Sequence, residues 1–369
     1  MRTRRTRRAL AAGLALSAIA LPLAACGDSG ERADGKTEIT FSYLWTGQED
    51  KAMQKIIADF NASQDEIVVK GVSNPDQQAQ LASMSGAKGT FDISDSFGST
   101  TGAFAAKGVI EPLDGFIEAD GYDTDDFLEP AMKQSRYDGR TYAMPIAVHS
   151  LMLLYNKDLL DEAGVTEPPR TTSEWASAIA KTTKVEGKKI QQLGWANPDL
   201  TTLGYTFGGG WFDDKGRPTP DHPGNIEAAQ FYVENVARKY GAPEVQKFTS
   251  GFGEYASPQN PFFQGKVAMV TDGEWMSAFI KEYAPDLNWG VAPIPYPDEK
   301  PELEKTTQLS SSTLFIPRNS RHKEEAWTFM KYLLDKKAML RFTHTLANIP
   351  SRKSLLDDPT YEDLPNFDA

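Results

Sequence analysis

The chain has 369 residues, 40% of them hydrophobic and 24% charged, with a formal net charge of −12. Domains usually hold roughly 100–200 residues, so this length predicts two domains or lobes, and the composition excludes a chain that is disordered throughout. Five arginines fall within the first eight positions, so the remainder is more acidic still. Because an acidic surface repels phosphate backbones, we expect no nucleic-acid partner.

An export signal is predicted at residues 1–25. Behind the arginine-rich start lies an uncharged, alanine-rich stretch that ends in Leu23-Ala24-Ala25-Cys26. A membrane-spanning helix needs about 20 consecutive apolar residues, and this stretch is shorter; a permanent anchor helix is the alternative. The four residues at its end match the lipobox of bacterial lipoproteins, in which the cysteine is acylated. We therefore expect a lipid anchor at Cys26, a polar tether over residues 26–37, and a location on the extracytoplasmic face of the cell membrane.

Predicted strands and helices alternate along the rest of the chain, which is the pattern of an α/β fold. Apolar residues alternate over residues 39–45, and capping boxes at Thr46 and Glu49 and at Thr171 and Glu174 predict two helix starts. Asn225 is the predicted cap of a long helix. Further strands are expected at 67–70, 91–94, 151–155, 266–270 and 313–316, and further helices at 77–84, 101–107, 157–163, 274–283 and 323–334.

Motifs for catalysis and for metal binding are missing from the sequence. There is no G-x-S-x-G, the four histidines have no metal-ligand spacing, and Gly208-Gly209-Gly210 lacks the pattern of a phosphate-binding loop. Carboxylates are so frequent that pairs arise by chance, and the separation that defines a glycosidase cannot be read from a sequence. We therefore expect no catalytic residues, no metal and no cofactor.

Three tryptophans occupy positions where ligands bind in open α/β sheets, near the carboxyl ends of strands. Trp45 ends the first predicted strand, and Trp275 follows Asp272-Gly273-Glu274. Trp211 follows three glycines in an irregular segment that also holds Tyr205. Flat aromatic rings cover the apolar face of a sugar while polar side chains satisfy its hydroxyl groups, so a carbohydrate site is predicted. Packing in the core is the alternative for each tryptophan.

Segments spread over almost the whole exported part resemble, in order, the family 1 extracellular solute-binding proteins of ABC transporters. The matching stretches include DGRTYAMP at 138–145, LYNKDLL at 154–160, FQGKVAM at 263–269, GEW at 273–275 and EAWTF at 325–329.

This resemblance implies a two-lobed periplasmic-binding-protein-like α/β fold of type II, with hinge strands between the lobes and a ligand cleft that closes on a solute. Residues 38–147 with 311–343 would form the first lobe, and residues 148–310 with 344–369 the second. The implied function is non-enzymatic: a monomer captures a sugar or oligosaccharide for an ABC permease. A lipoprotein glycoside-processing enzyme and a ligand sensor for a membrane kinase are the alternatives.

The resemblance also assigns candidate ligand-binding residues. Trp275 falls where the family places a sugar-stacking tryptophan, and Glu49 lies in the segment that offers a polar contact from the first lobe. Ser96 and Ser99 stand where maltose-binding members have a tryptophan and an aspartate, so maltose itself is not predicted. His149 occupies the place of a ligand-binding glutamate; a hinge histidine bonded to backbone is the alternative.

Family members usually continue for several dozen residues beyond the segment that resembles Ile349-Pro350-Ser351-Arg352, whereas this sequence ends at Ala369. The resemblance therefore predicts a fragment or a short variant. In both cases we expect uncovered apolar surface on the second lobe.

Overall fold

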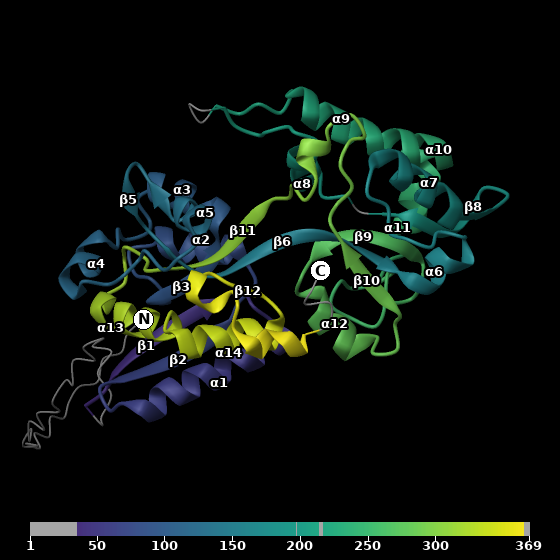
Figure 1. The fold of residues 1–369 in the computed structure, drawn as a ribbon. Helices are drawn as coiled ribbons and strands as arrows, with labels where there is room; N and C mark the ends of the chain where they lie inside the picture. The colour runs from purple at the N-terminus through teal and green to yellow at the C-terminus, as the bar shows by residue number, and fades with distance from the viewer. Residues whose placement is uncertain (1–34, 197, 214–216, 365–369) are drawn as a thin grey trace, which may run out of the picture.

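The computed structural model describes residues 35–196, 198–213 and 217–364 (Figure 1). The predicted export signal and Cys26 lie outside the described residues. Within these residues no helix is both long and apolar enough to cross a membrane. The strands are β1 (Thr37–Tyr43), β2 (Ile67–Ser73), β3 (Ile93–Phe97), β4 (Arg136–Tyr137), β5 (Arg140–Thr141), β6 (Met144–Asn156), β7 (Lys184–Glu186), β8 (Lys189–Trp195), β9 (Val267–Gly273), β10 (Trp289–Ala292), β11 (Leu309–Phe315) and β12 (Ile349–Pro350).

The first lobe is built on β1, which pairs in parallel with β2 and β3. Ile39, Phe41 and Tyr43 alternate along β1 and are fully buried, which explains why this stretch forms a central strand. Phe329 and Phe342 meet these residues from two helices on one face of the sheet, and together they form one core. The helices of this lobe are α1 (Gly47–Ser63), α2 (Gln77–Ser85), α3 (Gly98–Ala106), α4 (Asp114–Asp120), α5 (Glu129–Gln134), α13 (Lys323–Leu333) and α14 (Lys336–Leu346).

The second lobe has its own core around β8 and β9, which are parallel neighbours. Trp175 and Trp195 lie at its centre with ring centroids 4.3 Å apart, and Phe231 stacks on Trp175. The helices of this lobe are α6 (Lys157–Glu162), α7 (Thr172–Thr182), α8 (Leu200–Thr206), α9 (Pro223–Tyr232), α10 (Arg238–Tyr240), α11 (Ala242–Thr249) and α12 (Met276–Tyr283).

Two antiparallel strands, β6 and β11, run between the lobes (Figure 1). The first half of β6 pairs with β11 and β12, and its second half pairs with β9 and β10. Ile146 therefore belongs to the first core, whereas Leu153 of the same strand belongs to the second. The register between β6 and β11 shifts at Ser312 and Thr313, next to the point where the strands leave the first lobe.

Of the predicted caps, one capping box forms, one helix begins where predicted but without its capping box, and one predicted cap lies inside its helix. Thr171 and Glu174 form the predicted capping box at α7. At α1 the Thr46 side chain makes no capping hydrogen bond, so the first predicted box is wrong. The predicted cap Asn225 lies inside α9, whose N-cap is His222. Its amide instead donates to the carbonyls of Gly210 and Thr219, because the preceding loop folds back over the helix start.

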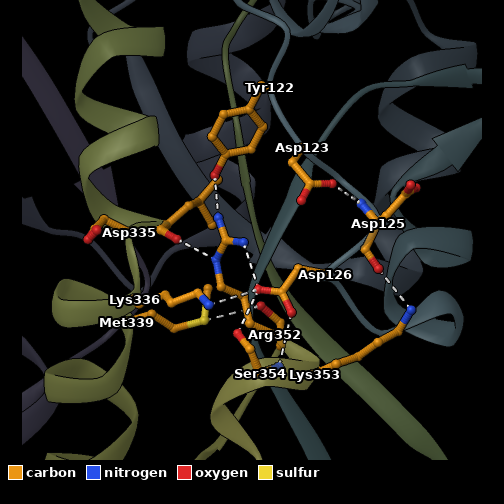
Figure 2. A network of polar contacts seen from close by, with 12 residues as sticks. Tyr122, Asp123, Asp125, Asp126, Asp335, Lys336, Met339, Arg352, Lys353 and Ser354 are labelled. Atoms are coloured by element: carbon orange, nitrogen blue, oxygen red, sulfur yellow. Dashed lines mark hydrogen bonds and ion pairs between the residues drawn. The ribbon is translucent and has the colours of Figure 1, made fainter.

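Residues 344–364 are bound to the first lobe, whereas the sequence places them in the second. Leu346 and Leu355 enter the first core, since the apolar stripe of α14 continues toward β12. Arg352 is 8% exposed and donates to the Leu334 carbonyl (2.8 Å), to the Asp126 carboxylate (3.1 Å) and to the Tyr122 hydroxyl (2.9 Å). Figure 2 shows this network, in which Ser354 also donates to Asp126. Its partners all lie in the first lobe.

Candidate functional site

A hollow of about 550 Å³ lies beside the strands that join the lobes. It contains residues of β6, β9 and the start of α12, an irregular segment around residues 252–262, and the chain entering β11. Its polar and aromatic lining side chains are Asp199, Phe252, Tyr255, Asn260, Phe262, Thr271, Asp272, Trp275, Gln308 and Ser310. We call this space the cleft hollow. None of the described side chains that line it is a lysine, an arginine or a histidine.

Trp275 is the central aromatic side chain of the cleft hollow. Its indole Nε1 donates to the Tyr255 hydroxyl at 2.7 Å, and that hydroxyl donates to Asp272 Oδ1, also at 2.7 Å. The ring lies over the backbone of Gly273, where a Cβ atom would approach the ring carbon Cζ3 to 2.0 Å. Only glycine fits at this position with the ring where it is. In the sequence Asp272-Gly273-Glu274-Trp275, the glycine thus leaves the space that the tryptophan ring occupies.

His149 links the same loop to both interlobe strands. Its Nδ1 lies 2.7 Å from Glu274 Oε1, and its Nε2 lies 2.9 Å from the Ser312 hydroxyl on β11. The second oxygen of Glu274 accepts from the Ser150 backbone N–H at 3.2 Å. The imidazole also meets the Trp275 ring edge to face, with centroids 5.4 Å apart. His149 therefore lies on a strand shared by both lobes, and its hydrogen-bond partners are side chains rather than backbone groups.

The first lobe contributes two carboxyl groups near this site, the half-buried Glu49 and the fully buried Asp95. Burial raises the pKa of Glu49, although a hydrogen bond from the Thr46 backbone and the charge of His149 lower it. Burial raises the pKa of Asp95 to about 8, against the hydrogen bond from the Leu44 N–H, and the charge of Glu49 adds to the rise. The charge of Glu49 reaches Tyr255 of the second lobe as well. Glu49 therefore lies close enough to the second lobe for its charge to act on Tyr255.

Asp272 is a half-buried acid in β9 of the second lobe. Burial raises its pKa to about 6, hydrogen bonds from Tyr255 and the Gly273 N–H lower it, and the charges of Glu274 and Asp199 raise it further. At neutral pH the carboxylate form dominates. Oδ1 takes both hydrogen bonds, while Oδ2 makes none with the described residues. The cleft hollow therefore offers a carboxylate oxygen beside an indole ring.

Of the sequence-predicted site residues, Trp275 lines the cleft hollow, and His149 contacts the Trp275 ring without lining the hollow itself. Glu49 lies near His149, whose charge opposes the rise that burial causes in the pKa of the Glu49 carboxyl group. Trp45 lies in the first core instead: it is 6% exposed, and its ring packs on Phe342 with centroids 4.7 Å apart. The alternation along β1 continues through residue 45, and this directs the indole inward to the core.

The remaining sequence-predicted residues lie outside the cleft hollow. Ser96 is buried in β3 and accepts from the Thr100 hydroxyl, whereas Ser99 is exposed on α3. Tyr205 lies on α8, and the Trp211 indole donates to the Thr201 carbonyl at the start of that helix. A ligand role for these four residues stays a prediction.

Sequence reasoning missed Tyr255, Asp199 and Thr271 as lining residues. Tyr255 lies in an irregular segment without periodicity, so no signal could have placed it under Trp275. Asp199 could have been noticed as the N-cap of α8, since its carboxylate accepts from the Thr202 N–H at 2.7 Å. Asp272 was visible only as part of the motif before Trp275.

A second hollow of about 340 Å³ lies on the other face of β6. Met152, Leu154, Trp289 and Val291 of the second lobe line it, together with residues of the C-terminal segment such as Leu364. The expected uncovered apolar surface on the second lobe stays a prediction.

Comparison with known proteins connects this geometry to a family. The sequence profile of the bacterial extracellular solute-binding proteins matches residues 45–340. A binding protein of Brucella abortus is 31% identical over 258 residues, which cover 68% of this chain and 60% of the relative. The maltotriose-binding protein of Pyrococcus abyssi is 28% identical over 72% of this chain and 55% of its own length. The chain thus spans less than two thirds of the length of these relatives.

Solved structures agree with the fold. The protein CpMnBP1 with mannotriose bound superposes with a TM-score of 0.79 at 27% identity, over 88% of this chain and 86% of that one. The GacH receptor of Streptomyces glaucescens, solved unliganded and with acarbose, gives a TM-score of 0.69 at 26% identity over 88% and 83%. The predicted two-lobed α/β fold of type II is confirmed. The chain belongs to the bacterial extracellular solute-binding protein family.

Proposed function

We propose that this chain is the solute-binding component of an ABC importer, which captures a sugar or oligosaccharide between its lobes and delivers it to the membrane permease. The observation that carries the proposal is the fixed Trp275 ring beside the Asp272 carboxylate, next to the strands that join the lobes. An indole face covers the C–H face of a pyranose, and a carboxylate accepts from its hydroxyl groups.

Further polar groups of the cleft hollow fit the hydroxyl rim of a saccharide. Thr271 is 7% exposed, and its hydroxyl has no hydrogen-bond partner among the described residues. A buried hydroxyl without a partner is costly, so a ligand that reaches it gains a hydrogen bond. Gln308, just before β11, and Ser310, in β11, also line the cleft hollow. The hollow of about 550 Å³ is in the usual size range of small-molecule sites.

The named ligands of similar proteins support oligosaccharides in particular. Maltotriose, mannotriose and acarbose occur in the names of proteins aligned over most of this chain. Other relatives bind arabinooligosaccharides and galactooligosaccharides, so relatives differ in the sugar that they take.

Closure of the lobes would convert binding into a signal for the permease. A ligand shifts an open–closed equilibrium only if it contacts the closed form better than the open one. Glu49 from the first lobe and Trp275 from the second would both contact the ligand, which favours closure. We further propose that the protein acts as a monomer anchored through acylated Cys26 on the extracytoplasmic face of the cell membrane.

The test is a titration of soluble protein lacking residues 1–26 with a panel of mono- and oligosaccharides, followed by tryptophan emission and by melting temperature. Saturable binding should raise the melting temperature by an amount set by RT ln(1 + [L]/Kd). Trp275→Ala should abolish binding of the identified sugar, and Tyr240→Phe, a change on α10 outside the cleft hollow, should keep it. Equal affinity of Trp275→Ala and the parent would refute the site. Turnover of a chromogenic glycoside would favour the enzyme alternative instead.

A further inference from the structure

A chain of hydrogen bonds, which we call the circuit, leads from the N–H edge of the Trp275 ring back to the loop that carries it. The indole Nε1 donates to the Tyr255 hydroxyl at 2.7 Å, which donates to Asp272 Oδ1 at 2.7 Å. The same oxygen accepts from the Gly273 N–H at 2.8 Å. The circuit starts and ends within residues 272–275 and passes through Tyr255, which comes from a separate segment. Rotation of the ring about its side-chain torsions breaks at least the bond to Tyr255.

Tyr255 is itself fixed by its neighbours. Its backbone carbonyl accepts from the side-chain amide of Asn260 at 2.8 Å, and Asn260 is 4% exposed. Its ring meets Phe279 of α12 edge to face, with centroids 5.7 Å apart. The other sides of the Trp275 ring contact the Gly273 backbone and the His149 ring. These contacts therefore restrict the orientation of the indole.

We propose that Tyr255 and Asp272 are positioning residues that hold the plane of the Trp275 ring in its ligand-binding orientation before the ligand arrives. The proposal rests on the proposed function of the same site. A side chain that is already ordered loses little rotamer freedom on binding, and this increases affinity. Neither residue has to touch the ligand for this effect.

The ionisation of Asp272 connects the circuit to pH. The groups that face Asp272 are Tyr255 from the irregular segment, Glu274 from its own loop and Asp199 from the start of α8. Because the pKa of Asp272 is raised to about 6, its carboxylate becomes protonated at a mildly acidic pH that experiments can reach. A protonated Asp272 is a weaker acceptor for the Tyr255 hydroxyl, because hydrogen bonds to charged acceptors are the stronger ones.

The experiment compares the parent protein with Tyr255→Phe, Asp272→Asn and the control Tyr240→Phe, a tyrosine on α10 outside the cleft hollow. The indole N–H resonance of Trp275 in ¹⁵N-labelled protein, assigned through Trp275→Phe, reports the circuit without any ligand. We expect it to move in Tyr255→Phe and to titrate near pH 6 in the parent but not in Asp272→Asn. Affinity for the saccharide found in the panel should fall about tenfold in Tyr255→Phe, the loss of one hydrogen bond, and stay unchanged in Tyr240→Phe.

The outcomes separate the two proposals. Parent-like affinity of Tyr255→Phe overturns the positioning role and leaves the proposed function intact, as does an indole resonance that is the same in the parent and in Tyr255→Phe. A parent protein that binds no saccharide overturns the proposed function. If Tyr255→Phe lowers both the melting temperature and the saccharide affinity, the indole N–H resonance decides between a general loss of stability and a positioning role. An unmoved resonance in a folded Tyr255→Phe protein contradicts the positioning role.

Discussion

His149 Nδ1 and Glu274 Oε1 lie 2.7 Å apart, and both side chains are about nine-tenths buried. The contact joins β6, which runs through both lobes, to the loop that places Trp275. Through Ser312 it also includes β11. The strands that join the lobes are therefore bonded to Glu274, the residue before the tryptophan that we propose binds the ligand.

His149→Ala should lower the free energy of unfolding by about 1–3 kcal/mol, because it leaves the buried Glu274 carboxylate with one partner fewer. It should also weaken saccharide binding, since the imidazole borders the Trp275 ring. Urea denaturation and the saccharide titration measure the two effects. Ser312→Ala keeps the His149 contact with Glu274 and should have the smaller effect on both. An unchanged denaturation midpoint in His149→Ala would argue against the pairing.

Gly273→Ala should displace the Trp275 ring, because the added Cβ would lie 2.0 Å from ring carbon Cζ3. Overpacking of this kind costs about 1–3 kcal/mol, and the moved ring should lose most of the saccharide affinity. Near-ultraviolet circular dichroism detects the ring displacement. Gly115→Ala on α4, where a Cβ meets nothing within 4 Å, is the matched control and should bind like the parent. Parent-like saccharide affinity in Gly273→Ala would show that ligand binding does not depend on the packing of the Trp275 ring against Gly273.

Arg352→Leu should destabilise the protein by about 3 kcal/mol, since it leaves the Asp126 carboxylate without its buried cation. Arg352 also lies over the Phe127 ring at 4.3 Å. Lys353→Ala removes only an exposed contact to the Asp125 carbonyl and should cost far less. Thermal unfolding of the two variants decides the matter, and equal melting temperatures would contradict a stabilising role for the network in Figure 2.

Asp95→Asn should change how stability depends on pH. Burial raises the pKa of Asp95 to about 8, above the unfolded value of about 3.9, so the folded state favours the protonated acid. The stability that protonated Asp95 contributes is complete below about pH 4 and is lost as the pH rises toward about 8. Asparagine can keep the bond from the Leu44 N–H without ionising. We expect the variant to gain stability relative to the parent between these pH values, and parallel urea curves across the range would exclude the effect.

The sequence predicts the architecture well because the relevant signals are local. Period-two alternation along β1 and the capping box at Thr171 reflect short-range physics, and the resemblance supplies the two-lobed arrangement. The position of residues 344–364 was wrong for a physical reason. Arg352 contacts Asp126 and Tyr122, which are more than 200 residues away in sequence. No local sequence pattern predicts such a contact.

A site residue can be located from the sequence when it belongs to a recognisable motif, but not when long-range packing determines its position. Trp275 follows a recognisable motif, and the structure places it in the cleft hollow. Trp45 looks equivalent at the end of a strand, yet Phe342 of α14 covers it. Tyr255 comes from a segment without periodicity, and only the folded chain shows that its hydroxyl lies between Trp275 and Asp272.

The continuous strand β6 makes the two hollows interdependent. Leu151 faces the cleft hollow, while Ser150, Met152 and Leu154 face the second hollow. Side chains of a strand alternate between faces, so inserting one residue after Val148 would exchange these two sets along the whole second half of β6. Met152 and Leu154 would then turn toward the cleft hollow, and Leu151 away from it, without any change to Trp275 itself. The number of residues in β6 therefore sets which of its side chains border each hollow.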